Sequence, residues 1–254
     1  MSSKISNIAC VILASGNSQR FNSSKSKLFY KVYGTPVIEI TLKNITNYIN
    51  KESIYITIPK KISKNERNLL SNYTNNKLIS GGKTRFNSLK NALKKIDSKK
   101  YLNLLVHDAA RPIVPRNLML ELLASMNSKK YHCAVPTSVV EDTLRKDNKT
   151  ITRENYKTYQ TPQIFNFKFF INKINKVKNI PTDDFGVIEN SKGLKIKNIE
   201  ASKENIKITK REDLKILKKI INYNIKFASG FDIHKLMKGS HLSLAGLKIK
   251  CNYQ

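Results

Sequence analysis

The sequence predicts an α/β fold in which a Rossmann-like, mostly parallel sheet carries helices on both faces and a protruding β-hairpin arm. Short apolar runs alternate with segments in which apolar residues recur every three or four positions. Polar and glycine-containing motifs directly follow several apolar runs, where the carboxyl ends of parallel strands would lie. With 254 residues, the chain is long enough for one large domain and an appendage.

Short apolar runs bounded by polar residues are typical of buried strands. They predict strands at residues 8–13, 54–58, 78–79 and 102–106. The segments between them have helical spacing, as in residues 85–96, where Phe86, Leu89 and Leu93 share one helix face. Helices are accordingly expected at residues 37–49, 65–73, 85–96 and 115–126. The alternation of predicted strands and helices breaks off after residues 131–135.

Residues 137–158 are predicted to form the arm. Two extended pieces, residues 139–144 and 150–153, flank a Lys-Asp-Asn-Lys sequence typical of a tight turn. The segment carries polar side chains that can serve a site or a partner subunit, namely Glu141, Asp142, Thr143 and Arg153. A solvated surface hairpin without such a role is the alternative.

The chain is strongly basic, with 47 Lys and Arg against 18 Asp and Glu and a net charge of +29. Such a charge fits nucleic acid, an anionic membrane or acidic small substrates. The lysines are spread along the chain among Asn and Ile, which a compositional bias also produces. We therefore predict no specific nucleic-acid partner and keep a non-catalytic RNA-binding module as an alternative.

The cysteines Cys10, Cys133 and Cys251 are widely spaced, which argues against a disulfide framework and favours a reducing, cytoplasmic compartment. No apolar stretch approaches the ~20 residues needed to cross a bilayer. We expect neither secretion nor a membrane partner.

The first candidate motif is Leu-Ala-Ser-Gly-Asn-Ser-Gln-Arg, directly after the first predicted strand. The small residues Ala14, Ser15 and Gly16 let backbone N–H groups approach an anion. Arg20 and Lys27 add charges that can reach phosphate oxygens. This pattern indicates nucleotide binding, although neither a dinucleotide fingerprint nor a Walker loop fits.

The second motif, His-Asp-Ala-Ala-Arg-Pro, ends the strand predicted at residues 102–106. Asp108 at a strand tip can hold Mg²⁺ or a sugar hydroxyl, and Arg111 can bind a phosphate bidentately. Alternatively, Asp108 caps the following turn and pairs with Arg111. We interpret His107 as a packed histidine rather than a base.

The third motif places Gly81 and Gly82 before the helix that carries Arg85 and Ser88. Backbone exposed at the glycines can hydrogen-bond a base edge, and the helix N-terminus and the Ser88 hydroxyl favour an anion. A plain strand-to-helix turn is the alternative.

In order and spacing, these motifs resemble the 2-C-methyl-D-erythritol 4-phosphate cytidylyltransferase family over roughly residues 5–225. The resemblance continues in Asp142-Thr143, Arg153, Thr161-Pro162-Gln163, the Thr182-Asp183-Asp184 turn and Asn205 to Thr209. The chain departs from the pattern at Ser18, where many members have a glycine, and at Ser26, where proline is common.

The resemblance implies a nucleotidyltransferase that moves a cytidylyl group from CTP to 2-C-methyl-D-erythritol 4-phosphate in non-mevalonate isoprenoid precursor biosynthesis. Because both reactants are anions, positioned cations and Mg²⁺ would do most of the catalysis. The attacking phosphate is already ionised, so no general base is expected. The alternative within this fold is a nucleotidyltransferase acting on another phosphorylated substrate, such as a sugar phosphate or a molybdenum-cofactor precursor.

The family also implies site residues and a homodimer formed through the arm. The implied catalytic residues are Arg20, Lys27, Arg153 and Lys207. The implied nucleotide-binding residues are Ala14, Ser15, Gly16, Gly82, Arg85, Ser88 and Asp108, with Asp108 also a possible Mg²⁺ ligand. The implied residues for the second substrate are Thr143, Arg153, Lys207 and Arg111.

Residues 226–254 resemble the opening of 2-C-methyl-D-erythritol 2,4-cyclodiphosphate synthase, in Ser-Gly-Phe-Asp-Ile-His and Leu-Ala-Gly. Asp232 and His234 resemble two zinc ligands, whereas catalytic zinc normally takes three protein ligands. We therefore expect a cytidylyltransferase domain at residues 1–225 and, at residues 226–254, the stub of a truncated second domain with an incomplete zinc site.

Overall fold

The computed structural model describes residues 7–16, 21, 26–127, 130–223, 237–244 and 247–252. The chain forms two compact units, residues 1–220 and 221–254. In the smaller unit, strands β13 (His241–Leu244) and β14 (Leu247–Lys250) pair as an antiparallel hairpin. Asp232 and His234 lie outside the described residues, so their role as zinc ligands stays a prediction.

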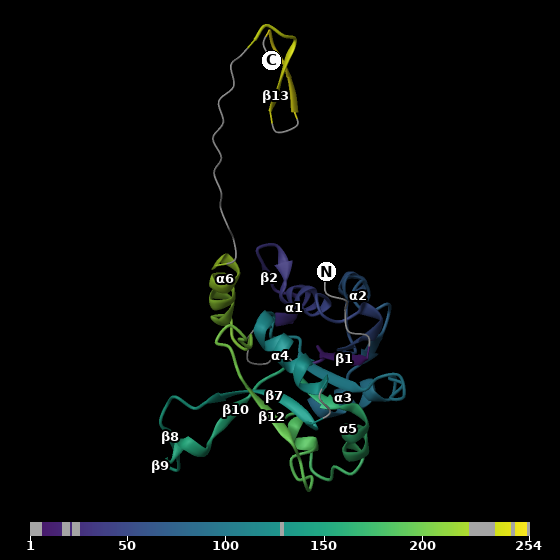
Figure 1. Ribbon diagram of the computed structural model, residues 1–254, viewed down its shortest axis with the longest axis vertical. Coiled ribbons are helices and arrows are strands. Elements are labelled where there is room, and N and C mark those ends of the chain that lie inside the picture. The colour runs from purple at the N-terminus through teal and green to yellow at the C-terminus, as the bar shows by residue number, and fades with distance from the viewer. Residues whose placement is uncertain are drawn as a thin grey trace. The chain divides into compact units, whose positions relative to one another are not determined.

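The larger unit is built on an eight-stranded sheet in the order β10-β7-β11-β6-β1-β4-β5, with β12 also paired to β7 (Figure 1). Strands β11 and β10 run antiparallel to their neighbours, and the remaining pairs are parallel. The prediction of a mostly parallel α/β sheet is confirmed. The strands are β1 (Ile8–Leu13), β4 (Ile54–Ile58), β5 (Leu78–Ser80), β6 (Asn103–Asp108), β7 (Cys133–Val139), β10 (Lys157–Tyr159), β11 (Gln163–Asn166) and β12 (Ile196–Glu200).

Four of the helices lie where the helical spacing predicted them. The helices are α1 (Val37–Thr46), α2 (Lys64–Ser71), α3 (Arg85–Leu93), α4 (Arg116–Asn127), α5 (Phe167–Ile174) and α6 (Asp213–Tyr223). Helix α1 ends before Ile49, and α3 ends before Ile96. Both isoleucines lie beyond the helix ends and are nevertheless buried, so the apolar spacing that predicted each helix extends past its end.

The central strands are buried on both faces, which explains why they appear as continuous apolar runs. In β1, Ile8, Cys10 and Ile12 join a core with α1 and α4, whereas Ala9 and Val11 join a second core with α3 and α5. Because side chains of a strand alternate between its faces, one strand supplies both cores. The prediction of helices on both faces is therefore confirmed.

The strand order reverses beside β1. From β1 the chain moves to β4 and β5 on one side, and then returns to β6 on the other side. In open α/β sheets, ligands bind at the carboxyl ends of the strands at such a reversal. Leu13 at the end of β1 is in register with Asp108 at the end of β6 and with Thr57 of β4.

The predicted arm is present but its strands are shorter than expected. Strand β7 stays in the main sheet through Val139, where it pairs with β10. The hairpin itself consists of β8 (Leu144–Lys146) and β9 (Lys149–Ile151), which pair with each other and project away from the sheet (Figure 1). Asp147 and Asn148 form the turn with φ of 50° and 62°, and positive φ at both central residues is what a type I′ hairpin turn requires.

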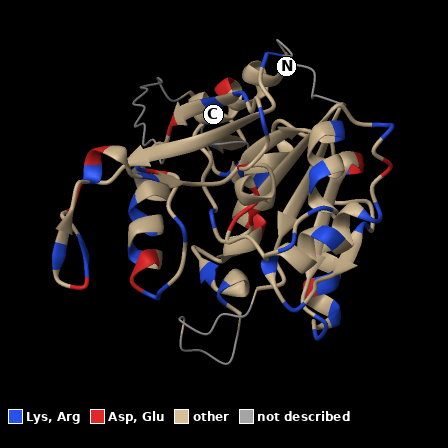
Figure 2. Cartoon of the chain, turned by 90° about the horizontal axis from the view of Figure 1, so that it is seen from below, with Lys and Arg blue, Asp and Glu red and all other residues tan. Residues whose placement is uncertain are grey.

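The remaining short elements are β2 (Lys31–Val32), which pairs with β3 (Thr35–Pro36), and the 3-10 turns η2 (Lys27–Phe29), η3 (Lys51–Ser53), η4 (Arg153–Asn155) and η5 (Phe185–Val187). None of the described helices is long and apolar enough to cross a membrane. Lysine and arginine are spread over helices, strand ends and loops in the view of Figure 2 rather than gathered in one stripe.

Candidate functional site

The first and third predicted motifs are joined by hydrogen bonds at the carboxyl edge of the sheet. Ser15 Oγ donates to Ser88 Oγ at 2.8 Å. Ser88 Oγ accepts from the Gly82 N–H at 3.0 Å and donates to the Thr84 carbonyl at 2.9 Å. The loop after β1, the glycine pair and the first turns of α3 thus form one unit.

The loop after β1 is also tied to β4, through a residue that the sequence did not single out. The Ala14 N–H donates to the Thr57 carbonyl at 3.1 Å and lies 3.2 Å from its Oγ1. Gly16, two residues later, is exposed, and a Cβ added to it would meet none of the described residues within 4 Å. The loop therefore leaves β1 in a fixed direction and reaches open space at Gly16.

Close packing explains the two glycines before α3. A Cβ at Gly81 would overlap the Cβ of Ser15, and a Cβ at Gly82 would lie 2.9 Å from the backbone carbon of Asn87. No side chain fits between these segments without moving one of them. The glycine pair is what allows α3 to begin next to the loop after β1.

Arg85, the first residue of α3, holds two carboxylates. Its Nε and Nη2 donate to Asp108 Oδ1 at 3.1 and 3.0 Å. Its Nη1 and Nη2 donate to Asp184 Oδ1 and Oδ2 at 2.5 and 2.8 Å. Thr84 caps the start of this helix, because its side chain accepts from the Asn87 N–H.

Asp108, at the end of β6, is buried and bound by two cations. Its Oδ2 accepts from Lys207 Nζ at 2.6 Å, while Arg85 occupies Oδ1. Burial alone would raise the pKa of Asp108, but the charges of Arg85 and Lys207 outweigh burial and hold that pKa well below its ordinary value. Asp108 is therefore ionised at neutral pH.

Asp184 is a member of the site to which the sequence analysis gave no role. The resemblance to a Thr-Asp-Asp turn placed it in a motif, and that is the only sequence signal for it. Its side chain is 2% exposed. Burial raises the pKa of Asp184, and the charge of Arg85 opposes that rise. The neighbouring Asp183 accepts from Gln163 Nε2 and the Gly186 N–H instead.

His107 is packed inside the turn that follows β6, as predicted. Thr161 Oγ1 accepts the Asp108 N–H at 3.0 Å and lies 3.2 Å from His107 Nδ1. His107 Nε2 lies 3.0 Å from the Arg111 carbonyl. A neutral ring satisfies every contact when Thr161 donates to Nδ1 and the Nε2–H donates to Arg111. Burial lowers the pKa of His107 to about 4.

Arg111 connects the same turn to the segment that carries Lys207. Its Nη1 donates to the Asn205 carbonyl at 2.6 Å. The Ile208 N–H donates to the Ala110 carbonyl at 2.8 Å. Burial lowers the pKa of Arg111. These two hydrogen bonds on either side of Lys207 explain how a residue so distant in sequence reaches Asp108.

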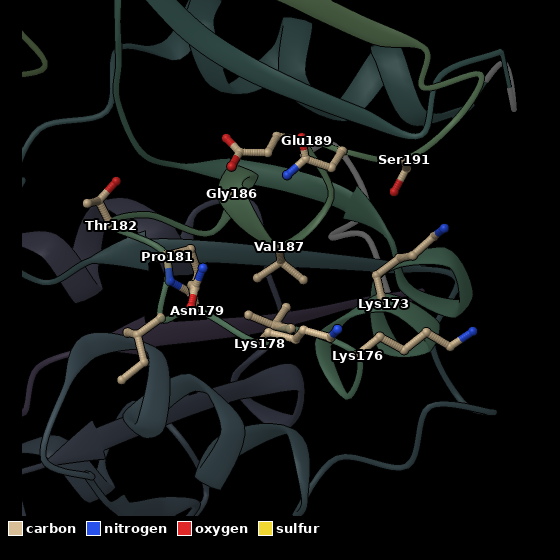
Figure 3. A pocket seen from close by; sticks show the side chains of 13 residues that line it. Lys173, Lys176, Lys178, Asn179, Pro181, Thr182, Gly186, Val187, Glu189 and Ser191 are labelled. Carbon is tan, nitrogen blue, oxygen red and sulfur yellow. The ribbon is translucent and has the colours of Figure 1, made fainter.

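Two cavities lie near these segments. One, of about 910 Å³, is lined by Arg111, Lys207 and residues of β7, β10, β12 and α6. The other, of about 590 Å³, lies between α5 and η5, with Lys173 and Lys176 on the side opposite Thr182 (Figure 3). No residue predicted for the site lines the second cavity, so the first is the one connected to Asp108.

Several residues predicted for the site have no contact with Asp108 or its partners in the part of the chain that the structure describes. Lys27 begins η2, and Arg20 lies outside the described residues. Thr143 and Arg153 are exposed on the arm, where Arg153 Nη1 donates to the Glu141 carbonyl. Among the described residues, no three His, Cys, Asp or Glu side chains are grouped to hold a metal ion. Asp108 offers one ionised carboxylate, which suits Mg²⁺ that is held mainly by substrate phosphates.

The family model of 2-C-methyl-D-erythritol 4-phosphate cytidylyltransferase matches residues 8–223. A bifunctional enzyme IspD/IspF of Pelagibacter ubique is 37% identical over 96% of this chain and 64% of its own length. A bifunctional enzyme IspD/IspF of Wolbachia pipientis is 32% identical over 99% of this chain and 66% of its own length. The chain thus spans about two thirds of the length of these relatives.

Solved structures have the same fold. The bifunctional IspDF of Campylobacter jejuni matches with a TM-score of 0.71 and 31% identity, over 98% of this chain and 64% of that chain. The 4-diphosphocytidyl-2C-methyl-D-erythritol synthase of Anaerococcus prevotii matches with a TM-score of 0.71 and 26% identity, over 85% of this chain and 96% of that chain.

Gly81→Ala is expected to destabilise the protein by about 1–3 kcal/mol, because the added methyl must displace Ser15. Gly16→Ala is the matched control, since the same methyl has open space there. Urea unfolding measures both. Equal effects of the two substitutions would contradict the packing argument.

Because His107 is buried, we expect the protein to lose stability in acid. Its pKa is about 4 in the folded protein and about 6.5 in an unfolded chain. Between these values the unfolded chain binds the extra proton, so stability falls as the pH falls. We expect the free energy of unfolding to decrease by roughly 2 kcal/mol more in the wild type than in His107→Gln from pH 7 to pH 5.

The comparison uses urea unfolding at both pH values. The lowered pKa of Asp108 affects stability in a more acidic range. The stability that ionised Asp108 contributes is lost only below its pKa in the unfolded chain, which is about 4. Identical pH dependence in the wild type and His107→Gln would refute the assignment.

Proposed function

Because the chain belongs to the 2-C-methyl-D-erythritol 4-phosphate cytidylyltransferase family, we propose that it transfers the cytidylyl group of CTP to 2-C-methyl-D-erythritol 4-phosphate and releases pyrophosphate. The observation that carries the proposal is that Arg85 and Lys207 meet at Asp108, while Ser88, one turn after Arg85 on α3, contacts Ser15 of the loop after β1. They meet at the strand reversal, where open α/β sheets bind their ligands.

The nucleotide would lie against the loop after β1 and the start of α3. Gly16 is exposed, and none of the residues that the structure describes would crowd a Cβ there, so a phosphate can approach its backbone. The glycine pair keeps α3 close to this loop, so its N-terminal end adds partial positive charge on the same side. Ala14, Ser15, Gly82 and Ser88 then shape the pocket rather than carry charge.

The reaction brings two anions together. An oxygen of the phosphate monoester attacks the α-phosphorus of CTP, the new P–O bond forms, and pyrophosphate leaves. Positioned cations must offset the repulsion between the two reactants. We assign this task to Arg20, Lys27 and Lys207. The side chain of Lys207 is 40% exposed, so a substrate can reach it.

Asp108 is the residue that would hold Mg²⁺. Its carboxylate is ionised, and a hard oxygen ligand suits this ion. When bound, Mg²⁺ neutralises part of the triphosphate charge. In the structure Lys207 contacts Oδ2 of this carboxylate, so Lys207 and the ion would share one acceptor.

The phosphorylated acceptor would enter the cavity of about 910 Å³, because Arg111 and Lys207 both line it. Lys207 also contacts Asp108, so the cavity adjoins the strand tips. Arg153 and Thr143 are on the exposed arm of the same chain. We propose that they act on the acceptor of a neighbouring subunit in a homodimer.

Two alternatives remain for the experiment to separate. One is a nucleotidyltransferase of the same fold that acts on another phosphorylated substrate, such as a sugar phosphate or a molybdenum-cofactor precursor. An RNA-binding module, motivated by the charge of +29, would bind RNA with a steep salt dependence. The cytoplasmic compartment and the stub of a second domain at residues 226–254 stay predictions.

The decisive experiment is pyrophosphate release with CTP and 2-C-methyl-D-erythritol 4-phosphate, run beside an RNA gel shift. Release that requires both substrates supports the proposal. Release with a sugar phosphate but not with methylerythritol phosphate, or tight RNA binding without any release, would replace it with one of the alternatives.

Lys27→Ala is expected to lower turnover by about 100-fold or more, on the scale of one lost electrostatic contact to the transition state. Lys31→Ala is the matched control, because Lys31 is an exposed lysine of the neighbouring strand β2. Pyrophosphate release measures both. Near-normal turnover of Lys27→Ala would remove this residue from the catalytic set.

Mixed dimers test the shared site. If Arg153 serves the neighbouring subunit, an Arg153→Ala chain mixed with a Lys27→Ala chain should form some sites in which both residues are intact. Activity of the mixture should exceed that of either variant alone. An inactive mixture of chains that demonstrably form dimers would argue against a site built from two subunits.

A further inference from the structure

Every nitrogen of the Arg85 guanidinium is bound to a carboxylate. Nε and Nη2 contact Asp108, and Nη1 and Nη2 contact Asp184, at distances of 2.5 to 3.1 Å. A guanidinium has five N–H groups in a rigid planar arrangement. Four of those donors are therefore used inside the protein. This contrasts with the expectation that Arg85 binds the nucleotide directly.

The three residues come from distant elements, and each of them fixes the next. Asp184 lies immediately before η5, Arg85 begins α3, and Asp108 ends β6. Asp184 is 2% exposed, so it has no room to follow a moving guanidinium. Held by Asp184 on one edge, Arg85 presents its other edge to Oδ1 of Asp108 alone. Oδ2 is left to Lys207.

We propose that Arg85 and Asp184 are positioning residues, which set the orientation of the Asp108 carboxylate for cytidylyl transfer without contacting CTP. The proposal rests on the proposed function for the reaction that it serves. In this arrangement, the contact with Asp184 prevents Arg85 from binding both oxygens of Asp108. Bidentate pairing is the geometry that a free guanidinium prefers with a carboxylate.

Removing the charge of Asp184 should therefore rotate Asp108 and displace Lys207. Asp184→Asn leaves Arg85 with one carboxylate partner, which it would then bind through both oxygens. The Oδ2 atom of Asp108 would then accept from Arg85 as well as from Lys207. A misplacement of about 1 Å at a reacting centre can lower the rate by up to about 100-fold, so we expect a loss of about 10- to 100-fold. Because Arg85 and Asp184 themselves do not contact CTP, the KM for CTP should change less than kcat.

The kinetic test uses Asp184→Asn, Arg85→Gln and the double variant, each assayed for pyrophosphate release with CTP and methylerythritol phosphate. We expect each single variant to lose kcat by 10-fold or more, and the double variant to lose no more than the worse single variant, because both act through Asp108. Arg85→Gln that raises the KM for CTP 10-fold or more would overturn the proposal, as would multiplicative losses in the double variant.

Asp183→Asn is the matched control. Asp183 is the neighbouring acid of the same turn, and it binds Gln163 and Gly186 rather than Arg85. If the turn mattered only as structure, Asp183→Asn would lower kcat as much as Asp184→Asn. That result would contradict a specific effect through Arg85. We expect kcat of Asp183→Asn to fall less than 3-fold.

A second measurement does not depend on the reaction. The ¹³C NMR signal of the Asp108 carboxyl carbon should shift in Asp184→Asn and stay unchanged in Asp183→Asn. No shift in Asp184→Asn overturns the positioning proposal, even if the wild type is an active cytidylyltransferase. A wild type that is inactive with CTP, together with the expected shift, would instead refute the proposed function and leave the positioning intact.

Arg85→Lys covers the case in which Asp184→Asn does not fold. Lysine keeps the positive charge but cannot contact two carboxylates with a planar fork. We expect the same loss of kcat with a smaller change in the KM for CTP, and the same shift of the Asp108 signal. Normal kcat in folded Arg85→Lys would overturn the proposal.

Discussion

The site depends on one ionised carboxylate that is buried at the end of β6. A charge removed from water is tolerated only when it is paired and hydrogen-bonded. Asp108 obtains its partners from two residues that are far away in sequence, Arg85 and Lys207. Arg85 is in turn balanced by the buried Asp184. The need to pair these charges therefore joins α3, the Asp184 turn and the segment around Lys207 at one strand tip.

The backbone of the turn after β6 provides the framework for this pairing. Thr161 accepts the Asp108 N–H, and neutral His107 spans from Thr161 to the Arg111 carbonyl. Arg111 and Ala110 bind the backbone on either side of Lys207. The bonds to Thr161, Asn205 and Ile208 tie this turn to distant parts of the chain. A rigid arrangement of this kind holds charges in place before a substrate arrives, which is how electrostatic catalysis avoids reorganisation.

The charge of the whole chain and the charge of the site are separate matters. The net charge of +29 is spread over the surface, whereas Arg85 and Lys207 are each paired with a carboxylate. Within this group, two cations face two carboxylates. The most that the net charge of the chain can do is raise the local concentration of anionic substrates. Discrimination and catalysis must come from the geometry at the strand tips.

Local pattern by itself determined the strands and most of the helices. Residues 8–13 and 54–58 were predicted to the residue, because a strand buried on both faces is apolar over most of its length. The same pattern placed three motifs at strand ends, where parallel strands bring them together. It failed where an apolar residue is buried without belonging to the helix, as at Ile49 and Ile96, and where an extended run is divided between the main sheet and the arm, as around Val139. The partners of Arg85 were decided only by the tertiary structure. Nothing near residue 85 specifies Asp184, because that contact depends on the strand order and on the path of a loop 99 residues away.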